Sequence, residues 1–129
     1  MLFPELSVLL DPALLLLRIL IALLFGSSGW SHATKPEERA ESIGMSPTFT
    51  LALGVVELVA AVSIGLGIFP QIGAILLIGV MLGAIQKKMF VWKTGFWGEK
   101  SNGWFYDALY LVCSLVIVAT GGGAWTVYP

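Results

Sequence analysis

Residues 47–69 read PTFTLALGVVELVAAVSIGLGIF, an apolar run with a single charged residue, Glu57, close to its centre. A helix that crosses a bilayer needs about 20 mainly apolar residues, because each residue advances ~1.5 Å through ~30 Å of hydrocarbon. Ser46 and Pro47 provide a hydroxyl N-cap followed by proline at the first helical position, which is typical of a helix start. Pro70 ends the run. The sequence therefore predicts a transmembrane helix over about 47–69.

Three further stretches have a similar length and the same apolar character, and they predict transmembrane helices over about 12–31, 71–92 and 103–120. Asp11 and Pro12 supply a cap-and-proline start for the first of these helices. Pro70 leaves almost no turn between 47–69 and 71–92, so these two helices are expected to be antiparallel neighbours. We therefore predict an all-α protein, a single domain over 1–129 that forms a four-transmembrane-helix bundle.

The composition indicates lipid as the main solvent. Apolar residues make up 57% of the chain and charged residues 12%, with a mean hydropathy of +0.90, whereas soluble domains carry about 25% charged residues. The formal net charge of −1 offers no basic surface for nucleic acid. Acidic residues rather than basic ones precede the first apolar run, so we expect it to remain in the mature protein and not to be cleaved as a signal peptide.

The connection between the first two spans contains KPEERAESIG, residues 35–44. Proline stands at its start, acidic residues occupy its first turn and glycine stands at its end, which is the pattern of a short capped helix. Because three acidic residues accompany few apolar ones, we expect a solvated surface helix here.

Basic residues gather near one side of the predicted bundle. All lysine and arginine residues except Arg18 lie in or next to two connections, the one between spans one and two and the one between spans three and four. They are Lys35, Arg39, Lys87, Lys88, Lys93 and Lys100. Cytoplasmic loops are enriched in lysine and arginine. We therefore expect a multi-pass protein with both longer loops in the cytoplasm and both termini outside.

All tryptophans fall near the ends of the predicted spans: Trp30, Trp92, Trp97, Trp104 and Trp125. An indole has an apolar body and a polar N–H, so tryptophan is enriched at the level of the lipid headgroups. We interpret the set as an aromatic belt; the alternative interpretation is a surface on which a cofactor stacks.

Three ionisable residues, Arg18, Glu57 and Asp107, lie within or at the start of the predicted spans. Such a group costs at least ~2.5–3.5 kcal/mol near mid-bilayer, so it normally faces the bundle and has a partner. If spans one and two are antiparallel, Arg18 and Glu57 lie within roughly 5–8 Å of each other in depth. We therefore predict an Arg18–Glu57 ion pair, which either fixes the helix register or marks a ligand or proton pathway.

A second polar group is expected near the cytoplasmic side. Asp107, Gln86 and Lys87 should lie at similar depth, and His32 ends the first span on the same side. These residues are interpreted as a polar funnel that leads toward Glu57. In the alternative interpretation Asp107 is a first-turn acid favoured by the helix dipole and His32 lies at the interface in water. The candidate ligand-binding set is Arg18, Glu57, Asp107, Gln86 and His32.

The sequence also excludes several kinds of site. One histidine excludes bis-histidine haem, and one cysteine, Cys113, excludes an internal disulfide and an iron–sulfur cluster held by this chain alone. The glycines at 121–123 lack the lysine and helix of a phosphate-binding loop. We expect no metal site and no cofactor of its own, and we assign no catalytic residue.

Several segments together resemble the DoxX family of small bacterial membrane proteins, over about Leu14 to Tyr128. They are LLLRILIALLFGSSGW with Arg18, ALGVVELVAAVSIGLGIFP with Glu57, GVMLGAI, the loop VWKTGFWGEKSNGW, and YDALYL with Asp107. The chain departs from the pattern at His32, where many members have a lysine.

The resemblance implies a four-helix bundle in the bacterial inner membrane and an association with quinone-linked redox chemistry. Members include a subunit of a thiosulfate:quinone oxidoreductase, and others work with partner proteins in oxidative-stress responses. We therefore expect an accessory or quinone-interacting subunit, non-catalytic by itself, that has lipid, a protein partner or a second copy as neighbours and binds quinone. The alternatives are a structural or assembly partner of a larger membrane complex and a small-molecule transporter.

Overall fold

The structure is a computed structural model that describes residues 2–91, 95–96 and 104–129. Over these residues it is helical, with one isolated bridge between Ile68 and Tyr128, so the all-α prediction is confirmed. The elements in order are η1 (Pro4–Leu9), α1 (Leu10–Thr34), α2 (Pro36–Ile43), α3 (Pro47–Leu66), α4 (Pro70–Gln86), the π-helical η2 (Lys87–Val91) and α5 (Phe105–Thr120).

The local signals at α2 and α3 act as expected. Ser46 caps α3 by accepting a hydrogen bond from the backbone N–H of Phe49 at 3.2 Å. The helix ends at Gly67, whose left-handed φ of 74° suits a residue without a Cβ. The short helix α2 ends in the same way at Gly44, φ 69°. The predicted surface helix between the first two spans is therefore present.

The start of α1 differs from the prediction. The helix runs from Leu10 to Thr34 and continues η1, so it exceeds 12–31 at both ends. Asp11 does not cap it. Instead, its carboxylate accepts a hydrogen bond from the backbone N–H of Ala124 at 2.9 Å. The carboxylate thus holds the C-terminal tail against α1.

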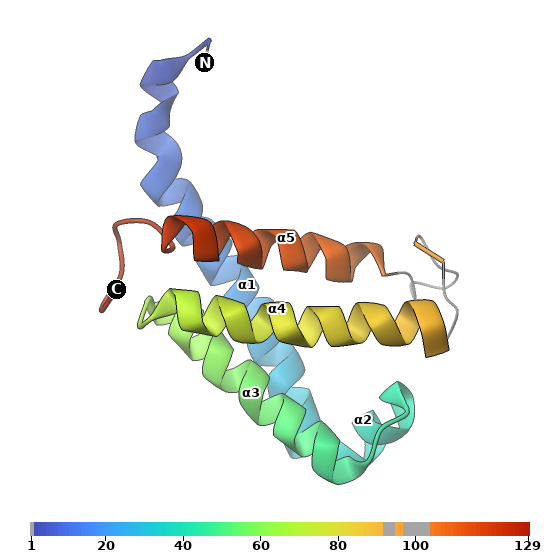
Figure 1. The fold of residues 1–129 in the computed structure, drawn as a ribbon. Coiled ribbons are helices and arrows are strands. Elements are labelled where there is room, and N and C mark those ends of the chain that lie inside the picture. Colours follow the sequence, from blue (N-terminus) through green and yellow to red (C-terminus); the bar gives the residue numbers. More distant parts are fainter. Residues whose placement is uncertain (1, 92–94, 97–103) are drawn as a thin grey trace.

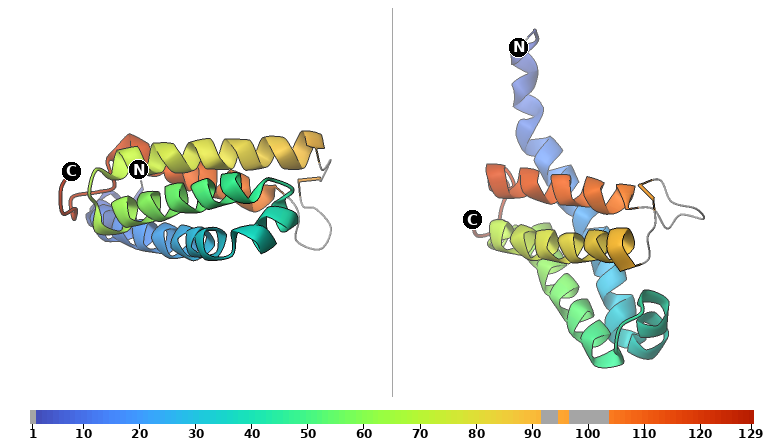
Figure 2. Two further views of the ribbon diagram at one scale, coloured as in Figure 1. Left: turned by 90° about the horizontal axis from the view of Figure 1, so that it is seen from below. Right: turned by 45° about the vertical axis from the view of Figure 1, so that its right-hand side comes forward.

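The helices form two pairs, α1 with α3 and α4 with α5 (Figure 1). The pairs meet at the end where Pro70 joins α3 to α4, and they diverge toward the end that carries α2 (Figures 1 and 2). The predicted contact between α3 and α4 is thus present, but it is concentrated at the Pro70 end. The N-terminal part of α1, with η1, extends beyond the other helices (Figure 2).

Glycines set how closely α1 and α3 approach. A Cβ built on Gly54 would lie 2.6 Å from the backbone nitrogen of Ala33 and 2.8 Å from the carbonyl oxygen of Gly29. A Cβ on Gly29 would lie 2.8 Å from the carbonyl oxygen of Gly54. Real side chains do not tolerate such distances, so only glycine at both positions allows this backbone contact.

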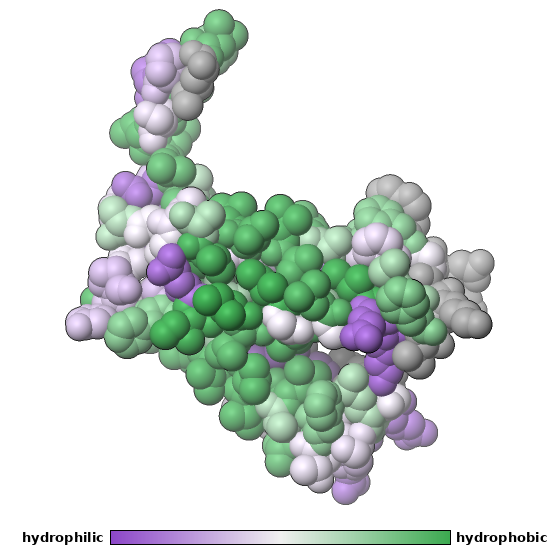
Figure 3. Space-filling view, in the orientation of Figure 1, coloured by the Kyte–Doolittle hydropathy of each residue, from purple (hydrophilic) through white to green (hydrophobic). Residues whose placement is uncertain are grey.

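The buried core lies between the two pairs and consists of Ile21, Phe25, Ala60, Ala61, Ile64, Ala74, Leu77, Met81 and Ile117. The outer faces are also apolar, and Figure 3 shows them as nearly continuous green over α4 and α5. Within the described residues, two helical stretches are long and apolar enough to span a membrane, Pro4–Thr34 and Pro47–Leu66. The other apolar helices, α4 and α5, are shorter.

The aromatic-belt prediction is only partly visible. Trp30 and Trp125 are exposed, and Trp104 makes an edge-to-face contact with Phe96, ring centroids 4.7 Å apart. Trp92 and Trp97 lie outside the described residues, as do Lys93, Lys100 and the predicted ends of the spans at 92 and 103.

Candidate functional site

Arg18 is fully buried in α1, but it does not pair with Glu57, so the predicted ion pair is wrong. The guanidinium donates hydrogen bonds instead to backbone carbonyl oxygens, at distances between 2.7 and 3.3 Å, of Ile64, Gly65, Gly122 and Trp125.

The new partners of Arg18 have a physical reason. Ile64 and Gly65 belong to the last turn of α3, where carbonyl groups lack helical partners and the helix dipole is negative. Gly122 and Trp125 belong to the tail that follows α5. Arg18 therefore joins α1, the end of α3 and the C-terminal tail, and it takes no part in the cavity described below.

Glu57 pairs with His32. The carboxylate Oε2 lies 3.3 Å from the imidazole Nδ1, and both side chains are buried, with residue exposures of 3% and 5%. The hydroxyl of Ser28, one turn earlier in α1, also lies 3.3 Å from Nδ1. The close approach of Gly29 to Gly54 brings these side chains of α1 and α3 together. His32 is thus part of a buried pair, and the interpretation of it as an interfacial residue in water is wrong.

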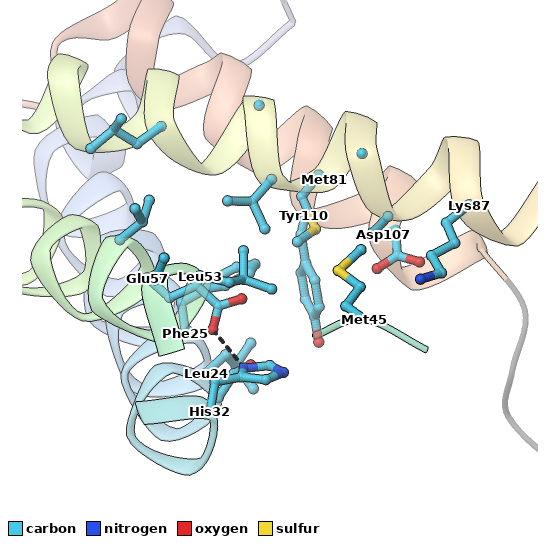
Figure 4. Close-up of a pocket in the computed structure, with 18 of the residues that line it drawn as sticks. Leu24, Phe25, His32, Met45, Leu53, Glu57, Met81, Lys87, Asp107 and Tyr110 are labelled. Atoms are coloured by element: carbon cyan, nitrogen blue, oxygen red, sulfur yellow. Dashed lines mark hydrogen bonds and ion pairs between the residues drawn. The ribbon is translucent and has the colours of Figure 1, made fainter. Parts of the chain in front are cut away.

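The second ring nitrogen of His32, Nε2, is buried and has no hydrogen-bond partner among the described residues. When Nδ1 carries the proton that it shares with Glu57, Nε2 is an acceptor in the neutral ring and a donor in the charged ring. Buried polar atoms normally have a partner, and one without it needs an explanation. Here the explanation is a neighbouring cavity (Figure 4).

The cavity has a volume of about 670 Å³ and lies where the two helix pairs diverge. His32 and Glu57 occupy one wall (Figure 4). The rest of the cavity lining is mostly apolar and includes Phe49, Ala52, Gly79, Met81 and Gly83. Ligand sites are commonly cavities of about 300–1,000 Å³ with apolar walls and a few polar groups, and this cavity has both properties.

Helix α5 and η2 provide the opposite polar wall. Asp107, in the first turn of α5, is buried and lines the cavity. Lys87 lines it from η2, and its Nζ donates a hydrogen bond to the carbonyl oxygen of Gly44 at 3.0 Å. This bond ties the end of α4 to the loop that precedes α3.

Tyr110 extends from α5 into the same cavity (Figure 4). Its ring makes an edge-to-face contact with Phe25 of α1, with centroids 5.4 Å apart and planes at 76°. No side chain or carbonyl of the described residues forms a hydrogen bond with its hydroxyl. Tyr110 therefore presents a second polar group to the cavity, and its position is fixed by packing.

The structure brings three of the five sequence-derived candidates, His32, Glu57 and Asp107, to one cavity. Gln86 is exposed and is not among the lining residues. Gln86 directly precedes Lys87, and adjacent residues of a helix point about 100° apart, so Gln86 turns away from the cavity where Lys87 lines it.

Tyr110 and Ser28 were not among the site residues predicted from the sequence. Each lies one turn from a candidate on the same helix face, Tyr110 three residues after Asp107 and Ser28 four residues before His32. Residues three or four positions apart on a helix are neighbours, so this spacing could have identified both residues from the sequence. Among the described residues, no group of three or more histidine, cysteine, aspartate or glutamate side chains is placed to hold a metal ion.

Comparison with known proteins identifies the family of this chain. The sequence profile of the DoxX family matches residues 13–93, more than half of the 129 residues, from the first turns of α1 to just beyond η2. The matched part includes His32 and Glu57 but stops before α5. Neither a curated protein nor a solved structure matches the chain significantly.

Proposed function

Since the chain belongs to the DoxX family of membrane proteins, we propose that it crosses the bilayer four times and serves as an accessory, quinone-interacting subunit of a membrane redox system. Two stretches, Pro4–Thr34 and Pro47–Leu66, have spanning length by themselves. Helix α4 continues through η2 to Val91, which gives it a comparable length. The short α5 (16 residues) lies beside α4 along its length (Figure 2), so we place it in the membrane too.

The proposed orientation puts α2 and the connection between η2 and α5 in the cytoplasm of a bacterial cell, and both termini outside. Lysine and arginine concentrate near these two connections, and cytoplasmic loops are enriched in both residues. The His32–Glu57 wall of the cavity then lies toward the cytoplasmic half of the bilayer.

The observation that carries the quinone proposal is the buried, unpartnered Nε2 of His32 beside an apolar cavity. A quinone is an uncharged ring whose oxygens accept hydrogen bonds, and in the reduced form they donate them. Nε2 matches either form, because its role changes with the protonation of the ring. The hydroxyl of Tyr110 can both donate and accept, so it provides the second contact.

His32 and Tyr110 position the quinone in this proposal. Glu57 and Ser28 fix the orientation of the imidazole through Nδ1, and the packing of Phe25 fixes the ring of Tyr110. We assign the electron transfer itself to a partner protein, so this chain holds the quinone headgroup while the partner supplies or removes electrons.

Quinone binding tests this proposal. The purified protein in lipid nanodiscs is titrated with a decyl-substituted benzoquinone, and the Kd is measured by calorimetry. His32→Phe and Tyr110→Phe are each expected to weaken binding by about tenfold, because a lost hydrogen bond to a ligand costs about 1–1.5 kcal/mol. Glu57→Gln should weaken binding by a similar factor, because the imidazole loses the carboxylate that fixes its orientation.

Ser114→Ala is the matched control for Tyr110→Phe. Ser114 is a buried hydroxyl residue of the same helix, its Oγ has no partner among the described residues, and it does not line the cavity. Its removal should leave the Kd unchanged. If the wild-type protein binds no quinone, or if all four variants bind it equally well, the proposal fails.

One observation favours an assembly role as a second candidate. The segment Pro4–Leu9 projects beyond the helix pairs (Figure 1), and Leu6, Val8 and Leu9 are exposed there. A protein partner that packs on this segment would co-purify with the His32→Phe and Glu57→Gln variants as well as with the wild type. It would be lost when Leu6, Val8 and Leu9 are changed to serine.

A further inference from the structure

We infer that the cavity opens sideways into the bilayer, between α3 and α4, and admits an uncharged headgroup that carries a hydrocarbon tail. The tail would leave the protein across Gly79 and Gly83. This inference rests on the proposed function for the membrane setting and for the polar headgroup, but the route itself can be tested without a quinone.

The first observation concerns the two glycines on α4. Gly79 and Gly83 are exposed, line the cavity, and are one turn apart on the same face. A Cβ built on either of them would meet nothing within 4 Å. Exposed Phe49 and half-buried Leu53 line the cavity from α3, on the other side.

Three other glycines of the bundle, Gly54, Gly65 and Gly73, are closely packed. A Cβ on Gly54 would collide with the backbone of α1, and one on Gly73 would lie 2.7 Å from the hydroxyl of Ser63. A Cβ on Gly65 would lie 3.0 Å from the Cβ of Ala22. Those three glycines serve helix packing within the chain, whereas Gly79 and Gly83 leave space open.

The open space beside Gly79 and Gly83 lies where helices α3 and α4 diverge. Helices α3 and α4 separate progressively from Pro70 onward (Figures 1 and 2), and the surface is hollowed between them near the α2 end (Figure 3). Mainly green and white residues border the hollow, and hydrophilic residues lie at the end of it where α4 ends (Figure 3). In a bilayer, such an opening faces lipid chains, so it suits a tail that remains in the hydrocarbon.

The polar groups inside indicate the chemistry of the head. His32 Nε2 is buried, has no partner among the described residues and faces the cavity, so it requires a hydroxyl or carbonyl oxygen. Two carboxyl groups, of Glu57 and Asp107, line the cavity together with the ammonium group of Lys87, so the lining has no excess positive charge to hold an anionic head such as a fatty-acid carboxylate. The occupant is therefore a neutral amphiphile drawn from the membrane.

The test uses a ten-carbon alcohol with a diazirine at its hydroxyl end, dissolved in phosphatidylcholine nanodiscs that contain the full-length protein. After irradiation, mass spectrometry locates the labelled residues. Met81 is buried yet lines the cavity, so a label there reports entry of the probe. Exposed Leu115 on α5 does not line the cavity, so its label reports contact with bulk lipid.

The double variant Gly79→Leu/Gly83→Leu closes the opening. It should fold, because each added side chain begins in open space and leucine favours a helix by up to about 1 kcal/mol over glycine. We expect labelling at Met81 to fall at least fivefold, with labelling at Leu115 unchanged. Ala119→Leu, an exposed position of α5 that does not line the cavity, is the size-matched control and should leave both labels unchanged.

The inference is overturned if Met81 is not labelled in the wild type. It is also overturned if Met81 is still labelled in the double variant. Native mass spectrometry that finds the wild type dimeric and the double variant monomeric overturns it too, because the glycines would then seat a helix of a second copy. If the double variant fails to fold, Gly79→Ala/Gly83→Ala replaces it and should lower the Met81 label about twofold. Blocked labelling in a protein that binds no quinone would support the side opening and refute only the quinone proposal.

Discussion

Replacing Arg18 with methionine is expected to lower the free energy of unfolding by about 3–5 kcal/mol. The side chain of methionine is apolar, so it can fill part of the space but cannot donate a hydrogen bond. Four backbone carbonyl groups, from the end of α3 and from the C-terminal tail, would lose the guanidinium that now satisfies them. In a membrane no water replaces such a donor, so the carbonyls remain unsatisfied.

Reversible unfolding by sodium dodecyl sulfate in mixed micelles measures this loss. Arg18→Lys should recover part of the stability, because an ammonium group can reach some of the carbonyls but not all of them. Leu20→Ala, an exposed position of the same helix, is the control and should cost under about 1 kcal/mol. An Arg18→Met protein as stable as Leu20→Ala would show that the guanidinium does not hold these segments together.

A single methyl group at Gly54 should have the second large effect. Gly54→Ala places a Cβ 2.6 Å from the backbone nitrogen of Ala33, so α1 and α3 must move apart. Overpacking of this kind typically costs about 1–3 kcal/mol, which exceeds the gain of about 1 kcal/mol from replacing glycine by alanine in a helix. Because His32 and Glu57 come from these two helices, their contact should lengthen and quinone binding should weaken as well.

Gly79→Ala is the matched control, since it makes the same chemical change in open space. It should leave the free energy of unfolding unchanged or raise it by up to about 1 kcal/mol. The same denaturant titration measures both variants. Equal effects of Gly54→Ala and Gly79→Ala would contradict the close backbone contact of α1 with α3.

Much of the fold follows from local signals in the sequence. The Ser46–Pro47 start, the breaks at Pro70 and the glycines at 44 and 121 place the helix boundaries within a few residues, because each signal acts on its own turn. The start of α1 was less predictable. Asp11 has the form of an N-cap, but its carboxylate binds Ala124, which lies far away in the sequence.

The pairing of the buried charges could not be predicted from depth alone. The register of α1 against α3 is set where Gly29 meets Gly54, and this contact places Arg18 level with Gly65 at the end of α3. Glu57 then faces His32. A small error in the assumed depth of Arg18 relative to Glu57 was therefore enough to predict Arg18 instead of His32 as the partner of Glu57.

The location of the cavity also depends on tertiary structure. The sequence indicated a polar funnel from His32 and Asp107 toward Glu57, and the structure places all three around the cavity. It could not indicate that Gly79 and Gly83 border empty space while Gly54 is tightly packed, because all three have the same small-residue signature. Only the angle between the helix pairs distinguishes them.

The most direct measurement is a high-resolution density map of the protein purified from its own membranes, with quinone retained during extraction. We predict density for a flat ring between Nε2 of His32 and the hydroxyl of Tyr110, and a chain that leaves between α3 and α4 over Gly79 and Gly83. A cavity closed by the protein's own side chains, with Nε2 of His32 bonded to one of them, would contradict the proposed site.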